Sequence, residues 1–322
     1  TMYATTYNLG IFKSIDGGKN WGFASFGIKS WYGMQLATHP EDADTVFTTT
    51  SGGVYKSTNA GESWRVIGGS DLCDDEEAGG NCHYHGIIIE KKAPFKVLVG
   101  SGGDQYSKED VGLTGSEDNG ESWRNSDDGF VRDVHVSKLI IDPNNNNVFY
   151  ATTQGATEYT DKVGDGAGVF KSTDRGNNWT QINNGLDSLE TNILTVDPND
   201  SETLYLGTDD DGVYKSKDGG ESWNKLTVSS LSKSFGVGDI IVDPQNSNNV
   251  YIGTVDYFRL SESRGVLGDF GVYKSTDGGA TWEEFNVGLN HLGVFSLELS
   301  EENRILYAGT RAGGVYWISL DN

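Results

Sequence analysis

The chain has 322 residues, with 44 Gly and 5 Pro, and its 47 acidic and 24 basic residues give a formal net charge of −23 at pH 7. A surface this acidic repels phosphate backbones, so the composition argues against nucleic acid as a partner. The sequence also contains no membrane-spanning segment, because no apolar run approaches the roughly 20 residues that such a helix needs.

A short pattern, Gly-(Val/Ile)-(Tyr/Phe)-Lys-Ser, recurs along the chain. Five complete copies and two degenerate copies begin at Gly10, Gly53, Gly112, Gly168, Gly212, Gly271 and Gly314. These starts lie 43 to 59 residues apart, a period typical of one four-stranded blade per repeat. The repeats therefore predict many short strands in place of helices.

Each repeat has the same order of expected strands. An apolar strand ends in Asp-Pro, as in residues 139–143, and a strand such as 204–208 follows it. The Gly-Val-Tyr-Lys-Ser strand comes third, and a strand led by Trp closes the unit. The first strand is the most uniformly apolar, which favours the innermost position. We therefore expect an all-β fold: a single β-propeller over residues 1–322 with about seven four-stranded blades.

The predicted first and last blades are incomplete. The chain opens at a second strand, residues 2–6, and stops after a third strand, residues 314–320. An unpaired strand edge is a liability, so the missing strands need an explanation. Three explanations are open: residues beyond both ends have been removed, the ring closes imperfectly, or a neighbouring chain donates a strand. We favour the first.

The turn between the third and fourth strands carries Ser-x-Asp-x-Gly-x-x-Trp, with Asn59 in place of Asp in one copy. This pattern resembles the Asp box of BNR-repeat propellers. Families of this kind include sialidases, xyloglucanase-type glycoside hydrolases, the sortilin (VPS10) ectodomain and photosystem II assembly factors. A short acidic side chain can accept hydrogen bonds from backbone N–H groups within a turn, and Gly readily adopts a conformation with positive φ. We therefore predict a structural role for Asp16, Asp118, Asp174, Asp218 and Asp277.

Strand direction alternates within a blade, so the Asp boxes and the longest connections lie on opposite faces. The long connections are residues 65–81, 102–113, 154–168 and 256–271. Long loops on a regular scaffold often carry function, so we expect ligands on the face opposite the Asp boxes.

Aromatic, histidine and charged residues gather near the start of the inner strands on that face, as in many ligand sites. The ligand-binding candidates are Trp31, Tyr32, His83, His85, Arg132, Asp133, His135, Glu190, Asp239 and His291. His83 and His85 share one face of a strand and could form part of a metal site. Ordinary hydrogen-bonded channel residues are the favoured interpretation.

Acidic side chains are frequent in the same loops, and carboxylates in loops can bind calcium. The calcium candidates are Asp104, Glu109, Asp209, Asp210 and Asp211. No run matches a complete calcium-binding loop, so a solvated acidic rim is the favoured interpretation. Cys73 and Cys82 are the two cysteines and bracket one acidic loop, which predicts a disulfide and an extracellular or cell-surface location.

Two classes of function remain open. A sialidase resemblance implies three arginines around a carboxylate, but Arg132, Arg259 and Arg264 are the arginines expected on this face and no Arg-Ile-Pro start is present. A xyloglucanase resemblance implies two carboxylates across a cleft, with Asp104, Asp133 and Asp239 as candidates.

No carboxylate pair stands out, so the sequence favours a non-catalytic binding or assembly propeller at the cell surface or outside the cell. Its partner on the acidic, loop-rich face would be a glycan, a peptide or a neighbouring protein subunit. The alternative is a glycoside hydrolase that uses a carboxylate pair on that face.

Overall fold

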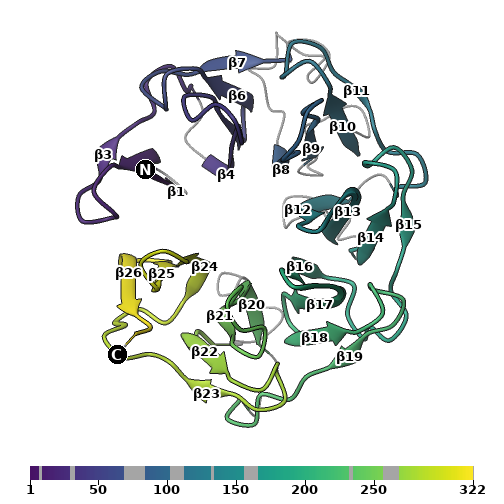
Figure 1. The fold of residues 1–322 in the computed structure, drawn as a ribbon, viewed down its shortest axis with the longest axis vertical. Coiled ribbons are helices and arrows are strands. Elements are labelled where there is room, and N and C mark those ends of the chain that lie inside the picture. The colour runs from purple at the N-terminus through teal and green to yellow at the C-terminus, as the bar shows by residue number, and fades with distance from the viewer. Residues whose placement is uncertain are drawn as a thin grey trace. The chain divides into compact units, whose positions relative to one another are not determined.

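The computed structural model describes residues 1–6, 9–29, 33–68, 84–101, 112–131, 134–155, 166–231, 235–256 and 268–321. Within these ranges the chain forms antiparallel strands and turns and contains no helix. It divides into two compact units, Thr1–Ile141 with Asn146–Gln181 and Asp142–Asn145 with Ile182–Asn322. Each unit consists of small sheets, whose strands run side by side in Figure 1.

Four sheets, numbered here as blades one to four, come first along the chain. Blade one has three strands, β1 (Met2–Thr6), β2 (Gly10–Ser14) and β3 (Gly22–Phe23). Blade two contains β4 (Gly33–Thr38), β5 (Val46–Thr50), β6 (Gly53–Ser57) and β7 (Arg65–Ile67). Blade three contains β8 (Tyr84–Ile89), β9 (Val97–Ser101), β10 (Leu113–Ser116) and β11 (Arg124–Asn125). Blade four contains β12 (His135–Asp142), β13 (Asn145–Gln154), β14 (Val169–Ser172) and β15 (Thr180–Gln181).

Three further sheets, blades five to seven, follow. Blade five contains β16 (Thr191–Asp197), β17 (Asp200–Thr208), β18 (Val213–Ser216) and β19 (Asn224–Lys225). Blade six contains β20 (Gly236–Val242), β21 (Val250–Val255), β22 (Val272–Ser275) and β23 (Glu283–Glu284). Blade seven has three strands, β24 (Val294–Ser300), β25 (Ile305–Thr310) and β26 (Gly314–Ser319). The fold is a seven-bladed β-propeller with three-stranded first and last blades, which confirms the fold predicted from the repeats.

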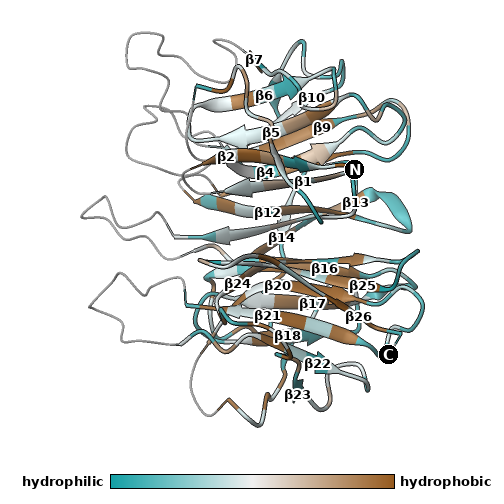
Figure 2. Ribbon diagram, turned by 90° about the vertical axis from the view of Figure 1, so that its left-hand side faces the viewer, coloured by the Kyte–Doolittle hydropathy of each residue, from teal (hydrophilic) through white to brown (hydrophobic). Residues whose placement is uncertain are grey.

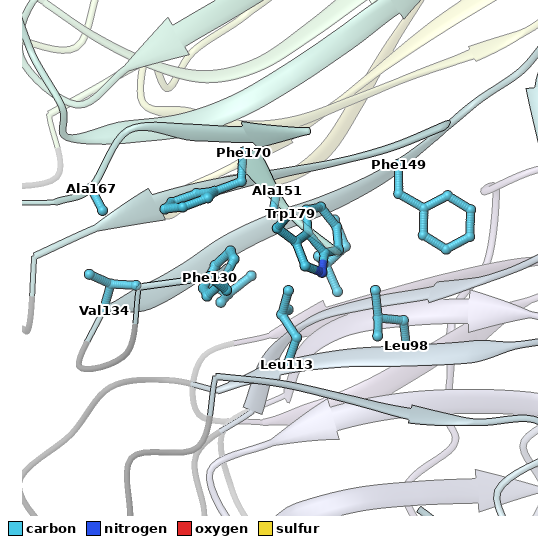
Figure 3. Close-up of a cluster of buried hydrophobic side chains, with 11 residues drawn as sticks. Leu98, Leu113, Phe130, Val134, Phe149, Ala151, Ala167, Phe170 and Trp179 are labelled. Carbon is cyan, nitrogen blue, oxygen red and sulfur yellow. The ribbon is translucent and has the colours of Figure 1, made fainter. Parts of the chain in front are cut away.

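Apolar side chains pack between neighbouring blades. In Figure 2 the strands carry most of the hydrophobic residues, while the turns are largely hydrophilic. Figure 3 shows the contact between blades three and four, where Phe130 and Phe170 lie beside Trp179. The two phenylalanine ring centroids are 4.3 Å apart, and those of Phe130 and Trp179 are 5.9 Å apart. Each fully buried side chain of this kind contributes roughly 1.5–3 kcal/mol, so the contacts between blades supply much of the core.

The Asp boxes are closed by a repeated set of hydrogen bonds. In blade five, the Ser216 hydroxyl donates to Asp218 Oδ1 (2.7 Å) and accepts the backbone N–H of Gly220 (2.9 Å). Asp218 in turn accepts the backbone N–H and the hydroxyl of Ser222. The Ser222 hydroxyl bond is the main reason that the pKa of Asp218 falls to about 2. The carboxylate therefore stabilises its own turn in the ionised form.

Three of the Asp-box tryptophans also bind the chain segment that leads into their own blade. Trp223 donates its Nε1–H to the carbonyl of Ile182 (2.7 Å) and its backbone N–H to the carbonyl of Asn184 (2.9 Å). Gly185, at φ 93°, lies so close that a Cβ would be 2.3 Å from the Trp223 carbonyl oxygen. Trp64 with Gly27 and Trp179 with Gly129 repeat this arrangement. Glycine is therefore required where the tryptophan meets its neighbour.

The lysine of the repeat makes a second link between blades. Lys215 Nζ donates to the carbonyl of Gly278 (2.7 Å), which lies in the Asp box of the next blade. Lys13 Nζ donates to Ala60 (2.6 Å) and Lys56 Nζ to Asn119 (2.8 Å) in the same way. Each accepting residue has a positive φ, between 53° and 69°. The left-handed backbone of one box therefore presents its carbonyl to the lysine of the blade before it.

Replacing Gly185 by Ala should destabilise the protein more than replacing Gly288, which has the corresponding place after blade six. Both have positive φ, 93° and 80°, but a Cβ on Gly288 would meet nothing within 4 Å. We expect Gly288→Ala to cost about 1 kcal/mol from backbone strain alone. Gly185→Ala should cost about 3 kcal/mol or more because of the added overlap. Urea unfolding of both variants checks this, and equal losses would contradict the close approach.

Acid should weaken the Asp boxes within a defined pH range. The pKa of Asp218 is about 2 in the folded protein, below its unfolded value of about 3.9. The box therefore contributes its full stability above about pH 4 and loses it as the pH falls toward 2. We expect the difference in Tm between the wild type and Asp218→Asn to shrink over this range. A difference that stays constant from pH 6 to pH 2 would contradict the assignment, and Asn59→Asp is the reciprocal control.

Candidate functional site

The end of the blades opposite the Asp boxes carries the connections between second and third strands. At the base of six of these connections, a threonine at or near the end of the second strand donates its hydroxyl to the carbonyl of the glycine at the start of the third, whereas blade three has Ser101 at this position. These pairs, which we call Thr staples, are Thr6–Gly10, Thr50–Gly53, Thr153–Gly168, Thr208–Gly212, Thr254–Gly271 and Thr310–Gly314, at 2.9 to 3.0 Å. Thr50 and Gly53 are three residues apart, whereas Thr254 and Gly271 are seventeen apart. The same hydrogen bond therefore closes the ends of both short and long connections.

The inner strands begin with irregularities at this end. The register of β8 shifts between Tyr84 and Ile87, and that of β20 shifts between Val237 and Asp239. A third shift, in β24, lies between Val294 and Ser296. Such bulges are frequent next to binding sites because they change the direction of a side chain. His85, Asp239 and Phe295 all lie at these bulges.

Two of the predicted site residues, His85 and His135, lie in contact within the first unit. They come from the neighbouring inner strands β8 and β12, and their ring centroids are 3.8 Å apart at 73°. His135 is buried, and the backbone carbonyl of His85 accepts the hydroxyl of Thr49 (2.7 Å). Five other predicted residues lie outside the described residues: Trp31, Tyr32, His83, Arg132 and Asp133.

Asp239 is used to join two blades. Its Oδ1 accepts the N–H of Ile240 (2.8 Å), and its Oδ2 accepts the N–H of Leu297 in β24 (2.8 Å). Asn192 makes a comparable link, since its side-chain amide donates to the carbonyl of Val237 (2.7 Å). Both carboxylate oxygens of Asp239 therefore have structural partners.

The three residues Asp209–Asp211 have different hydrogen-bond partners. Asp211 accepts the hydroxyl of Tyr214 and pairs with Lys225 Nζ, while Asp210 accepts the hydroxyl of Ser188 (3.0 Å). Asp209 is buried, and its backbone N–H donates to the carbonyl of Glu190 (3.0 Å).

Within the described ranges, no three acidic, histidine or cysteine side chains form a group that could hold a metal ion. Asp104 and Glu109 lie outside these ranges, as do Cys73 and Cys82, so calcium binding and the disulfide stay predictions.

A cluster of four residues in blades six and seven is not predicted by the sequence. Arg311 directly follows Thr310, the threonine of the last Thr staple, and packs its guanidinium 5.3 Å from the centre of the Phe295 ring. Its Nη2 donates to the backbone carbonyl of Asp256 and lies 3.8 Å from Asp269 Oδ1. Asp269 Oδ1 also accepts the N–H of Asp256 (2.9 Å), and Asp256 is fully buried. We call these four residues the Arg311 cluster.

The surface of the Arg311 cluster combines an aromatic ring with a cation. Phe295 lies on an inner strand, yet 40 % of it is exposed, and Leu292 nearby in the chain is 39 % exposed. His291, a predicted site residue, lies against Gly313, where a Cβ would be 2.3 Å from its ring carbon Cδ2. The sequence signal for this cluster is an arginine directly after the threonine of a staple.

Known proteins resemble this chain in sequence and in fold. The family model described as "Sortilin, neurotensin receptor 3" matches residues 167–315. A xyloglucanase from Paenibacillus sp. is 29 % identical over 251 residues, which are 75 % of this chain and 20 % of that enzyme. The chain therefore spans about one fifth of the length of this relative. No helix among the described residues has the length and apolarity to cross a bilayer.

Two solved structures illustrate the similarity of fold. The GH74 xyloglucanase from Xanthomonas campestris has a TM-score of 0.69 at 17 % identity, over 98 % of this chain and 49 % of that one. YCF48 bound to D1 peptide has a TM-score of 0.68 at 13 % identity, over 99 % of this chain and 88 % of that one. With its repeated boxes, its seven blades and these similarities, the chain is an Asp-box β-propeller.

Proposed function

We propose that this chain is a binding propeller, at the cell surface or outside the cell, that holds a neutral polysaccharide on the end of its blades bearing the Thr staples. The observation that carries the proposal is the half-exposed Phe295 ring with Arg311 packed against it. An aromatic face can stack on a sugar ring, and a guanidinium can donate hydrogen bonds to its hydroxyl groups. The net charge of −23 disfavours an anionic ligand.

The support around this ring favours a site that is rigid before a ligand binds. Asp256 and Asp269 hold the guanidinium, and Asp239 fixes β24 through the N–H of Leu297. A rigid site loses less conformational entropy on binding. The xyloglucanase relative is consistent with a polysaccharide as the ligand class.

Binding is favoured over hydrolysis by what the described carboxylates do. A glycosidase needs one carboxylic acid and one carboxylate facing each other across the scissile bond. Asp239 accepts two backbone amides, Asp211 is paired with Lys225, and Asp269 faces Arg311. Each of these three groups supports the scaffold.

A glycoside hydrolase is the second candidate function. It is favoured by the similarity to a xyloglucanase over 75 % of the chain. Asp104 and Asp133, both outside the described residues, would then be the first carboxylates to test.

Replacing Phe295 by Ala should weaken polysaccharide binding about fivefold or more, because the ring would supply stacking worth at least about 1 kcal/mol. Affinity electrophoresis and calorimetry with xyloglucan and other neutral polysaccharides measure this. Phe23→Ala is the matched control, since Phe23 is 69 % exposed on a strand of blade one. Binding that is lost equally in both variants, or a wild type that binds no polysaccharide, would overturn the proposal.

Incubating the protein with the same polysaccharides distinguishes the two candidate functions. Mass spectrometry of the supernatant detects released oligosaccharides. A binding module leaves the polysaccharide intact, whereas released products would establish hydrolysis and direct attention to Asp104 and Asp133.

A further inference from the structure

A hollow of about 470 Å³ lies between blades one and two, beside their Asp boxes. Strand β3 and the Asp box of blade one form one side of it, and Gly61 and Glu62 in the Asp box of blade two form the other. All of these strands and turns belong to the described residues. The lining includes no residue of the Arg311 cluster, so the hollow is a separate feature of the protein.

The hollow is open because a glycine stands where the next blade has an arginine. Gly22 in β3 pairs with Lys13 in β2, and Arg65 in β7 pairs with Lys56 in β6, so the two residues hold the same place in successive blades. A Cβ on Gly22 would meet no atom closer than 3.9 Å, and Gly22 has no positive φ. The backbone therefore does not require a glycine at this position, and a side chain would have room.

The junction of blades two and three shows which group fits such a place. Arg65 Nη2 there donates to Glu121 Oε1 in the Asp box of blade three, at 2.8 Å. Lys56 Nζ lies beside this pair, 3.9 Å from Glu121 Oε1, and donates to a backbone carbonyl of the same box. The repeat thus accommodates a guanidinium, an ammonium and a carboxylate side by side.

The hollow between blades one and two has the same groups apart from the guanidinium. Lys13 Nζ donates to the carbonyl of Ala60, as the lysine of blade two does to its own neighbour. Glu62 follows the glycine of its Asp box, as Glu121 does in the next box. Glu62 is exposed and has no ion pair with any described residue. Its carboxylate therefore faces a hollow without the cation that its counterpart binds.

We propose that this hollow binds an arginine side chain of another protein. The guanidinium takes the place that Arg65 has in the next junction and pairs with Glu62. Trp21 and Phe23 also line the hollow, and a planar guanidinium stacks on aromatic rings. The net charge of −23 attracts a basic partner. An exposed ion pair contributes little by itself, so the arginine is one contact within a larger partner surface.

An NMR titration of the whole chain with the peptide acetyl-Gly-Arg-Gly-amide tests the chemistry of the hollow. We expect saturable shifts of the Trp21 indole and Gly22 amide resonances. The peptide with lysine in place of arginine should bind more weakly, because an ammonium lacks the planar, two-pronged geometry of a guanidinium. Gly22→Arg should abolish the shift of the Trp21 indole, because the new side chain would pair with Glu62 within the protein.

Two variants of equal charge separate a specific site from general attraction to an acidic protein. Glu62→Gln should lower the affinity for the arginine peptide about threefold or more. Glu121→Gln is the matched control, since it removes the same charge from the same place in the next Asp box, where Arg65 already occupies the site. We expect this control to bind the peptide as the wild type does.

Three results of the titrations would overturn the proposal. They are no saturable shift at Trp21, equal affinity for the arginine and lysine peptides, and equal affinity in the Glu62→Gln and Glu121→Gln variants. In sedimentation velocity, a concentration-dependent dimer that Gly22→Arg dissociates would also overturn it, by placing a second copy of the chain in the hollow. Polysaccharide binding, which concerns Phe295, is measured separately, so the two proposals can fail independently.

Discussion

Within each unit, blades depend on one another for backbone hydrogen bonds that a single blade cannot make. Trp64 in the Asp box of blade two donates twice to the end of blade one, and Lys13 of blade one donates to the carbonyl of Ala60 in the same box. These bonds are buried in part, and burial lowers the pKa of Lys56 and Lys215. A buried ammonium without its carbonyl partner would be costly, so the links select one spacing between neighbouring blades. The Asp box is therefore a joint between blades as well as a turn within one.

The sequence predicted the fold well because its signals are local and repeated. The period of the Gly-Val-Tyr-Lys-Ser pattern gave the seven blades, and the missing first and fourth strands of the end blades could be counted directly. The reason that a lysine recurs at the position of Lys56 in the repeat could not be read from the sequence, because its acceptor at Asn119 lies in the next blade. Hydrogen bonds between blades can be identified only from the three-dimensional structure.

The candidate site was less predictable for the same reason. His85 and His135 could be placed at one end of the inner strands, and they prove to be in contact. Asp239 is predicted near a ligand, and the sequence does not show that its two oxygens accept backbone amides of two blades. Arg311 and Phe295 are sixteen residues apart, and nothing in the spacing shows that a cation lies on an aromatic ring. Residue type alone does not distinguish a scaffold carboxylate from a functional one.

The Thr staples have a consequence for how such a protein diversifies. Each staple fixes the two ends of a loop with one hydroxyl, which also accepts an amide from within the connection, as from Asp211 at Thr208 (2.9 Å). The entropy of closing a loop grows slowly with its length, so once the ends are fixed an insertion costs little. Loops can then be exchanged or lengthened between the same two residues while the strands keep their register. The recognition loops can therefore change in sequence and length during evolution without a large loss of blade stability.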